Sequence, residues 1–153
     1  MIRILTFCFV LLSFSGYSQN YINKSKAEVT KELKEYISKN DSLNAIVSAS
    51  DTAIVLSIKG PKTLPADFIY RFDKAGKCIS EKIVAGCDSC FNKYFQAVLD
   101  RKKYEWRKIN ENQYVSGFAA KMMIEIPANN KDFSFIILRT SWSKQMYDLL
   151  TGN

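Results

Sequence analysis

Two kinds of hydrophobic spacing alternate along this chain, and their order limits the folds open to it. Residues 25–37 place apolar side chains at helical spacing, and residues 43–84 change to runs in which apolar and polar residues alternate. The same change recurs, from a helical stripe at residues 91–99 to extended runs within residues 104–140. Helices with one apolar stripe and strands with one apolar side must each be covered by another layer. We therefore expect an α+β domain in which two main helices cover an antiparallel sheet.

The first helix is predicted by its start signal as well as by its stripe. Ser25 and Glu28 have the spacing of the N-cap and N3 residues of a capping box. Four extended runs follow, separated by polar or Gly- and Pro-containing turns: residues 43–49, 52–58, 66–73 and 77–84. This order predicts a helix followed by a four-stranded meander.

The second half repeats this plan. A helix capped by Asp88 or Ser89 begins after Gly86, and three main extended runs follow it. These runs are residues 104–109, 121–126 and 133–140, with a further short run at residues 113–116. A short helix is expected at the C-terminal end. The predicted order is therefore α-ββββ-α-βββ with a short C-terminal helix.

The N-terminal residues are typical of a signal peptide. Arg3 supplies a positive charge, residues 4–14 are apolar, and small residues occupy the −3 and −1 positions if cleavage falls after Ser18. The apolar run is too short to span a bilayer comfortably. We expect residues 1–18 to be removed and residues 19–153 to form one domain, periplasmic or secreted. No later run approaches membrane length, so no transmembrane segment is expected after removal of the signal.

The absence of histidine excludes several chemistries. The chain has no His, which rules out Ser-His-Asp and Cys-His catalysis and every His-ligated metal site. The net charge of +7 comes from basic residues interspersed with acidic ones, a pattern typical of a solvated surface rather than a nucleic-acid site. We expect no cofactor, no bound metal and no nucleic-acid partner, and we favour a protein that is not an enzyme.

A hairpin sequence in the first half carries a resemblance to known proteins. Residues 72–77 have the sequence Phe-Asp-Lys-Ala-Gly-Lys between two strands, within a helix-then-meander order. This resembles the PepSY-like and beta-lactamase-inhibitor-like families of exported bacterial proteins. The signal ending in Tyr-Ser-Gln and the Lys-, Asn-, Ile- and Phe-rich composition are similar to small exported proteins of the Bacteroidota. The resemblance implies export, an α+β sheet domain, and binding or inhibition of a partner protein.

Three cysteines follow residue 18: Cys78, Cys87 and Cys90. An odd number in an oxidising compartment allows at most one intramolecular disulfide. We favour a structural bridge from Cys78 to Cys87 or Cys90, which would tie the fourth strand to the second helix. The alternative is a redox pair of Cys87 and Cys90, because a helix N-terminus stabilises a thiolate. A zinc site of the three thiolates with Asp88 is favoured least, since a single CxxC motif predicts it weakly.

Four aromatic residues are candidates for a binding surface: Tyr104, Trp106, Tyr114 and Phe118. Aromatic residues at alternating strand positions pack in cores or against cross-strand neighbours more often than they bind ligands. No pair of carboxylates can be assigned as general acid and base. We therefore expect an exported, non-enzymatic domain that binds or inhibits a protein or a cell-envelope ligand. The alternative is a thiol-disulfide redox protein that uses Cys87 and Cys90.

Overall fold

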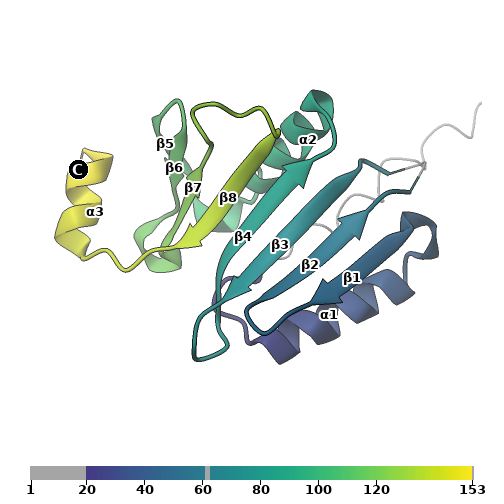
Figure 1. Ribbon diagram of the computed structural model, residues 1–153. Helices are drawn as coiled ribbons and strands as arrows, with labels where there is room; N and C mark the ends of the chain where they lie inside the picture. Colours follow the sequence, from purple (N-terminus) through teal and green to yellow (C-terminus); the bar gives the residue numbers. More distant parts are fainter. Residues whose placement is uncertain (1–19, 61–62, 153) are drawn as a thin grey trace, which may run out of the picture.

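The computed structural model describes residues 20–60 and 63–152. Within these ranges the chain forms one eight-stranded antiparallel sheet and three α-helices (Figure 1). The predicted α+β class with an antiparallel sheet is therefore confirmed, whereas the predicted signal peptide at residues 1–18 lies outside the described residues. None of the described helices is both long and apolar enough to cross a membrane.

The strands form two four-stranded meanders that meet at the centre of the sheet. The first meander consists of β1 (Ala45–Ala49), β2 (Ala53–Ile58), β3 (Ala66–Phe72) and β4 (Cys78–Ala85). The second consists of β5 (Arg107–Asn110), β6 (Gln113–Val115), β7 (Met122–Glu125) and β8 (Ser134–Arg139). The order across the sheet is β1-β2-β3-β4-β8-β7-β6-β5. The last strands of the two meanders, β4 and β8, thus pair with each other, and we call this pairing the seam.

The second meander has four strands where the sequence predicted three. The short run at residues 113–116 forms β6, which pairs with both β5 and β7. So short a strand is sufficient here because neighbours on both sides satisfy its backbone groups. The preceding strand also begins later than predicted, since Lys102–Tyr104 (η3) forms a 3₁₀ turn. The order of α-helices and strands is therefore α-ββββ-α-ββββ-α.

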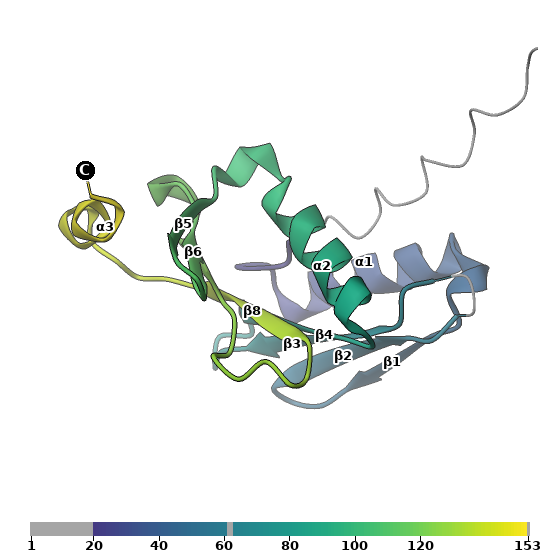
Figure 2. The ribbon, with the colours of Figure 1, turned by 90° about the horizontal axis from the view of Figure 1, so that it is seen from above.

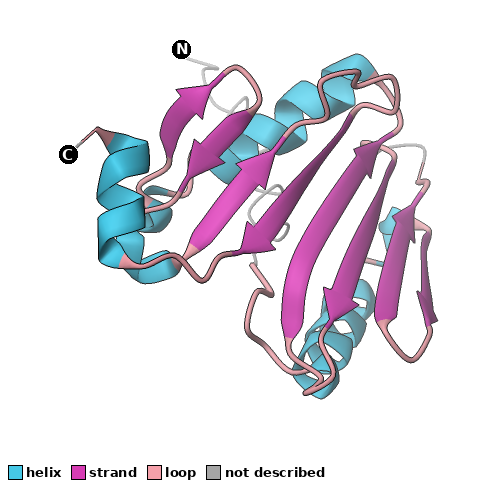
Figure 3. Cartoon of the chain, turned by 60° about the vertical axis from the view of Figure 1, so that its left-hand side comes forward, coloured by secondary structure: helices cyan, strands magenta, loops and turns pink. Residues whose placement is uncertain are grey.

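Helices α1 (Lys26–Ser38) and α2 (Asp88–Leu99) lie on the same side of the sheet (Figure 2). Their inward stripes include Val29 and Leu33 from α1, and Tyr94 and Val98 from α2. The sheet residues of the same core are mainly Ile54, Leu56, Ile58, Phe68, Tyr70, Ile83, Ile124, Phe135 and Ile137. Helix α3 (Lys144–Thr151) contacts β5 at one end of the twisted sheet, and no described helix covers the opposite sheet face (Figure 3).

The start of α1 follows the predicted capping box. The Ser25 hydroxyl accepts a hydrogen bond from the Glu28 N–H at 3.3 Å, and the Glu28 carboxylate accepts one from the Ser25 N–H at 2.6 Å. These two bonds satisfy backbone donors that the first turn of a helix leaves without partners. The Ser25 hydroxyl also donates to the Glu28 carboxylate at 2.6 Å, and this bond, together with the one from the Ser25 N–H, holds the pKa of the Glu28 carboxyl below its usual value.

Candidate functional site

The structure joins Cys87 to Cys90 in a disulfide and leaves Cys78 as a free thiol. The bridge from Cys78 that the sequence analysis favoured is not formed, because of the length of β4. Cys78 begins this eight-residue strand, and the other two cysteines follow its far end. At about 3.3 Å per residue the two ends are roughly 20 Å apart, whereas the Cα atoms of a disulfide lie within about 7 Å of each other.

Cys78 is a core residue. Its side chain has no exposed surface, and its thiol donates to the Ser80 carbonyl at 3.5 Å. Burial, followed by the nearby charge of Glu81, raises the pKa of Cys78 to about 12, so the thiol stays protonated and unreactive at neutral pH. Within residues 20–60 and 63–152, no group of three or more Cys, Asp or Glu side chains could hold a metal ion.

The disulfide forms the first turn of α2. Cys87 is the N-cap residue in place of the predicted Asp88 or Ser89, and its sulfur accepts a hydrogen bond from the Cys90 N–H at 3.1 Å. Its extended backbone lets it end the preceding segment while the next residue begins the helix. Cys87 is partly exposed, whereas Cys90 is only 2% exposed. A thiol approaching from solvent therefore meets the sulfur of Cys87 first.

Gly86 directs the chain from β4 into α2. Its N–H donates to the Pro65 carbonyl at 2.8 Å, and a Cβ at this position would lie 2.7 Å from Pro65 Cγ. Only a residue without a side chain fits so close an approach. The Tyr94 hydroxyl adds a bond to the Leu64 carbonyl at 2.7 Å. The disulfide is thus anchored by α2 and by the loop that precedes β3.

The four aromatic residues predicted as a binding surface divide into two places. Tyr104 and Trp106 lie with ring centroids 5.9 Å apart, Tyr114 packs edge-on against Phe95, and all three contact the main core. Phe118 instead contacts Tyr147 of α3, with ring centroids 5.5 Å apart.

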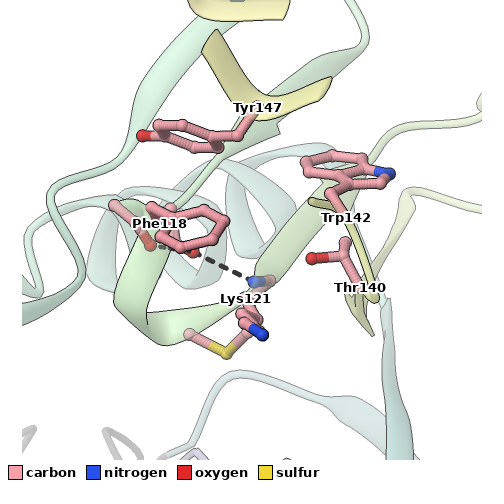
Figure 4. Close-up of a pocket in the computed structure, with 8 residues that line it drawn as sticks. Phe118, Lys121, Thr140, Trp142 and Tyr147 are labelled. Atoms are coloured by element: carbon pink, nitrogen blue, oxygen red, sulfur yellow. Dashed lines mark hydrogen bonds between the residues drawn. The ribbon is translucent and has the colours of Figure 1, made fainter. Parts of the chain in front are cut away.

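A small pocket lies beside this second contact (Figure 4). Phe118, Lys121, Thr140, Trp142 and Tyr147 point toward it. The space between these side chains is too narrow to admit a water molecule. The pocket is therefore a packing gap between α3 and the sheet rather than a ligand site.

Glu81 is a buried acid that was not among the residues predicted from the sequence. It lies on the helix-covered face of β4, opposite Tyr70 on β3 and Ile137 on β8, and is 2% exposed. Burial raises its pKa to about 7, against the opposing effects of the Arg101 charge and a hydrogen bond from the Tyr21 backbone. A signal was available, because Glu81 is in phase with the inward residues Ile83 and Ala85 of its strand. Since it lies at the seam, its charge bears on stability.

The uncovered face of the sheet carries aliphatic side chains from five adjacent strands. We call this group the open-face patch: Val55, Ile69, Val84, Met123, Ile136 and Leu138. Each is partly exposed, and Lys82 lies between Ile69 and Ile136 in one cross-strand row. The solvated face of an antiparallel sheet is usually polar. An apolar group in this position therefore marks a candidate interaction surface.

Comparison with protein-family models, with curated proteins and with solved structures finds no match to this chain. The fold and the site define a broad class, an α+β domain with one uncovered sheet face and a disulfide at the start of a helix. The resemblance to the PepSY-like and beta-lactamase-inhibitor-like families stays a prediction from the sequence.

Proposed function

We propose that this protein is an exported, non-enzymatic domain that binds or inhibits a protein or cell-envelope ligand through the open-face patch. One observation carries this proposal: the partly exposed aliphatic side chains lie on the sheet face that α1 and α2 leave uncovered. Export, to the periplasm or to the exterior, is part of the proposal and rests on the signal-like sequence of residues 1–18.

The dimensions of the patch suit a protein partner. It draws on β2, β3, β4, β8 and β7, which are consecutive in the sheet. Neighbouring strands lie about 4.8 Å apart, so the patch is roughly 20 Å wide, close to the scale of a standard protein interface.

Charges of both signs lie around these aliphatic residues. Asp67, Arg71, Lys82 and Glu125 are on the same face of the sheet. Charged side chains at an interface contribute more to the specificity of binding than to its affinity.

A capture experiment tests the proposal. Immobilised protein is incubated with cell-envelope extract, and bound ligands are quantified by mass spectrometry. We expect Ile136→Lys to lower recovery of the ligand at least tenfold, because it replaces an aliphatic side chain of the patch with a second positive charge directly opposite Lys82. Leu149→Lys is the matched control, since Leu149 is a 77% exposed apolar residue on α3. Equal recovery by the two variants, both folded by circular dichroism, would contradict the proposal.

The Cys87–Cys90 disulfide favours a second function, thiol-disulfide exchange. In the oxidised form a substrate thiolate would attack Cys87 Sγ, forming a mixed disulfide as Cys90 leaves as a thiolate. A second substrate thiolate would then attack the substrate sulfur and release Cys87, so that the substrate is oxidised and the pair is reduced. The nearby dipole of α2 would favour the released Cys87 thiolate, although Asp88 in the first turn opposes it.

The reduction potential separates the two functions. A structural bridge is expected below about −300 mV, and an exchange protein between about −270 and −120 mV. We expect the first result, measured by equilibration with glutathione and thioredoxin couples. A potential in the second range, with oxidation of a reduced test protein that Cys87→Ser abolishes, would favour the redox function.

A further inference from the structure

The two ends of the sheet differ in how they protect their edges. The outer strand β5 carries Arg107 and Lys108 and contacts α3. At the other end β1 has the sequence Ala-Ile-Val-Ser-Ala, without a charge or a proline, and among the described strands it pairs only with β2. Edge strands that lack such protection readily pair with a further strand. β1 is therefore the open edge of this sheet.

The hairpin between β1 and β2 fixes which backbone groups are unpaired. The Ser50 N–H donates to the Ala53 carbonyl at 2.9 Å, and bonding positions alternate along an antiparallel pair. Ser48 and Ile46 therefore bond to β2, whereas Ala45, Val47 and Ala49 direct their N–H and C=O groups outward. Val47 is 38% exposed, so the middle of this edge is accessible.

Helix α1 places positive charge beside this edge. Its lysine flank, which we define as Lys26, Lys31 and Lys34, borders one hollow on the helix surface. Lys26 Nζ donates to the carbonyls of Ser50 and Asp51 in the β1–β2 turn, so this flank lies on the β1 side.

The acidic side of α1 faces the other way. Lys24 Nζ pairs with Glu32 at 2.7 Å, and the Lys24 carbonyl accepts a bond from the N–H of Cys78 on β4. Glu32 thus lies toward the centre of the sheet. Glu35 pairs with Lys31 at 4.0 Å, so the other two lysines of the flank supply its net positive charge next to the open edge. This arrangement favours a negatively charged occupant of the edge.

We propose that β1 binds an extended, acidic peptide segment of a protein partner by strand addition. This inference rests on the proposed protein-binding function and names the chemistry of the ligand. In the added strand, the residue paired with Val47 would direct its side chain to the helix-covered face, near the lysine flank. Asp or Glu fits this position. Intervening side chains would lie beside Ile46, which is 63% exposed on the open face, where apolar residues fit.

A second copy of this chain fits the edge less well. Pairing β1 with its own copy around a two-fold axis would bring two lysine flanks close together. Like charges that face each other oppose association. The charge of α1 therefore distinguishes an acidic peptide from self-association.

Hydrogen exchange with a defined peptide tests this inference. The probe is the acetylated and amidated peptide Thr-Glu-Val-Glu-Val-Glu-Thr, and its control has Lys in place of each Glu. In the free protein we expect fast exchange at Val47 and slow exchange at Ile46 and Ser48. The acidic peptide should slow exchange at Val47, and the basic peptide should bind at least tenfold more weakly. Equal binding of both peptides, or protection elsewhere than β1, would overturn the inference.

Three variants separate the contributions. Val47→Pro removes an outward N–H without removing a bond to β2, and Lys34→Glu reverses one charge of the lysine flank. We expect each to weaken binding of the acidic peptide at least tenfold. Lys93→Glu makes the same charge change at an exposed residue of α2 and should leave binding unchanged. Unchanged affinity in Lys34→Glu, or a tenfold loss in Lys93→Glu, would overturn the role of the lysine flank.

The remaining outcomes separate this inference from the proposed function. A dimer in sedimentation equilibrium that Val47→Pro dissociates would show that β1 pairs with a second copy of the chain. That result would overturn the proposal of an acidic peptide ligand. Loss of the envelope ligand in Ile136→Lys, without any binding of the acidic peptide, would overturn this inference alone. Peptide binding together with equal ligand capture by Ile136→Lys and Leu149→Lys would support the edge site and contradict the open-face patch.

Discussion

The two halves of the sheet follow one plan, but their covering helices begin by different means. In both α1 and α2 the N-cap residue is joined to residue N3. Ser25 and Glu28 are joined by hydrogen bonds, and Cys87 and Cys90 by a covalent bond. Glu28 is exposed, so its charge is solvated, whereas Cys90 is 2% exposed and belongs to the core. The burial of residue N3 therefore decides which kind of cap a helix can use, because a buried Glu would lose its hydration.

The cores of the two halves also differ. The first meander has the longer strands, and its core combines aliphatic side chains such as Leu56 and Ile58 with the buried rings of Phe68 and Tyr70. The second meander has shorter strands, and beside it Phe91, Phe95 and Phe135 are in mutual contact at centroid distances of 5.3 to 5.7 Å. This cluster of three rings compensates for the smaller number of strand residues, since each ring buries more surface than an aliphatic side chain.

The largest expected effect comes from removing an aromatic ring next to the seam. Phe135 on β8 pairs with Ile83 on β4 and contacts two rings of α2. We expect Phe135→Ala to lower the free energy of unfolding by about 3–5 kcal/mol, because it leaves a cavity in a packed core. Urea unfolding followed by tryptophan fluorescence measures this, and both tryptophans lie in the second half of the chain.

The matched change in the first half is Leu33→Ala, expected to cost about 2–5 kcal/mol. Because the seam joins the halves, this change should shift the fluorescence transition as well as the circular dichroism transition. A fluorescence midpoint that does not respond to Leu33→Ala would mean that the halves unfold independently.

The next effect concerns pH and Glu81, which lies on the seam strand β4. Its pKa is about 7 in the folded protein, against 4.5 when unperturbed. The folded state therefore binds the proton more tightly, and stability that is complete below pH 4.5 is lost as pH rises toward 7. The difference corresponds to about 3 kcal/mol. Arg101 is the charged side chain that moderates this loss.

Glu81→Gln should therefore flatten the decrease in stability between pH 5 and pH 8, measured by urea unfolding at each pH. Glu125→Gln on the open face is the control and should leave the decrease in place. An unchanged slope in Glu81→Gln would assign the pH dependence to other groups.

The disulfide cap of α2 should contribute less. Cys87→Ser with Cys90→Ala removes the cross-link and is expected to cost about 2 kcal/mol, because the closed loop is short. Cys87→Ala with Cys90→Ala removes the N-cap acceptor as well and should cost about 1 kcal/mol more. Thermal unfolding of the two double variants gives the difference. Equal stability would show that the cap needs the disulfide rather than an acceptor at residue 87.

The smallest expected effect belongs to the hydrogen-bonded cap of α1. Ser25→Ala should lower stability by about 1 kcal/mol, since one backbone donor of the first turn loses its partner. Chemical denaturation measures the change. A greater loss here than in the Cys87→Ser, Cys90→Ala double variant would reverse the proposed ranking of the two caps.

Features set by neighbouring residues were predictable from the sequence. The capping box at Ser25 and Glu28, the helical stripes and the antiparallel strands all follow from local spacing. The absence of a Cys78 bridge could also have been predicted, because eight extended residues exceed the reach of a disulfide. The seam gives no such signal, since β4 and β8 are brought together by the topology of the whole sheet. The extra strand β6 is too short for its alternation to distinguish it from a loop.

The seam also has a consequence for the order in which the chain can fold. The pairings within each meander join neighbouring segments, whereas Ser80 must find Leu138, and Val84 must find Ser134, across about a third of the chain. Such distant contacts form slowly, because a long loop must close before they contribute. Until β8 pairs with it, β4 is itself an edge strand with a row of unpaired backbone groups. A chain interrupted before residue 134 would therefore carry an exposed strand at the centre of its future sheet, and this species is the one most prone to aggregate.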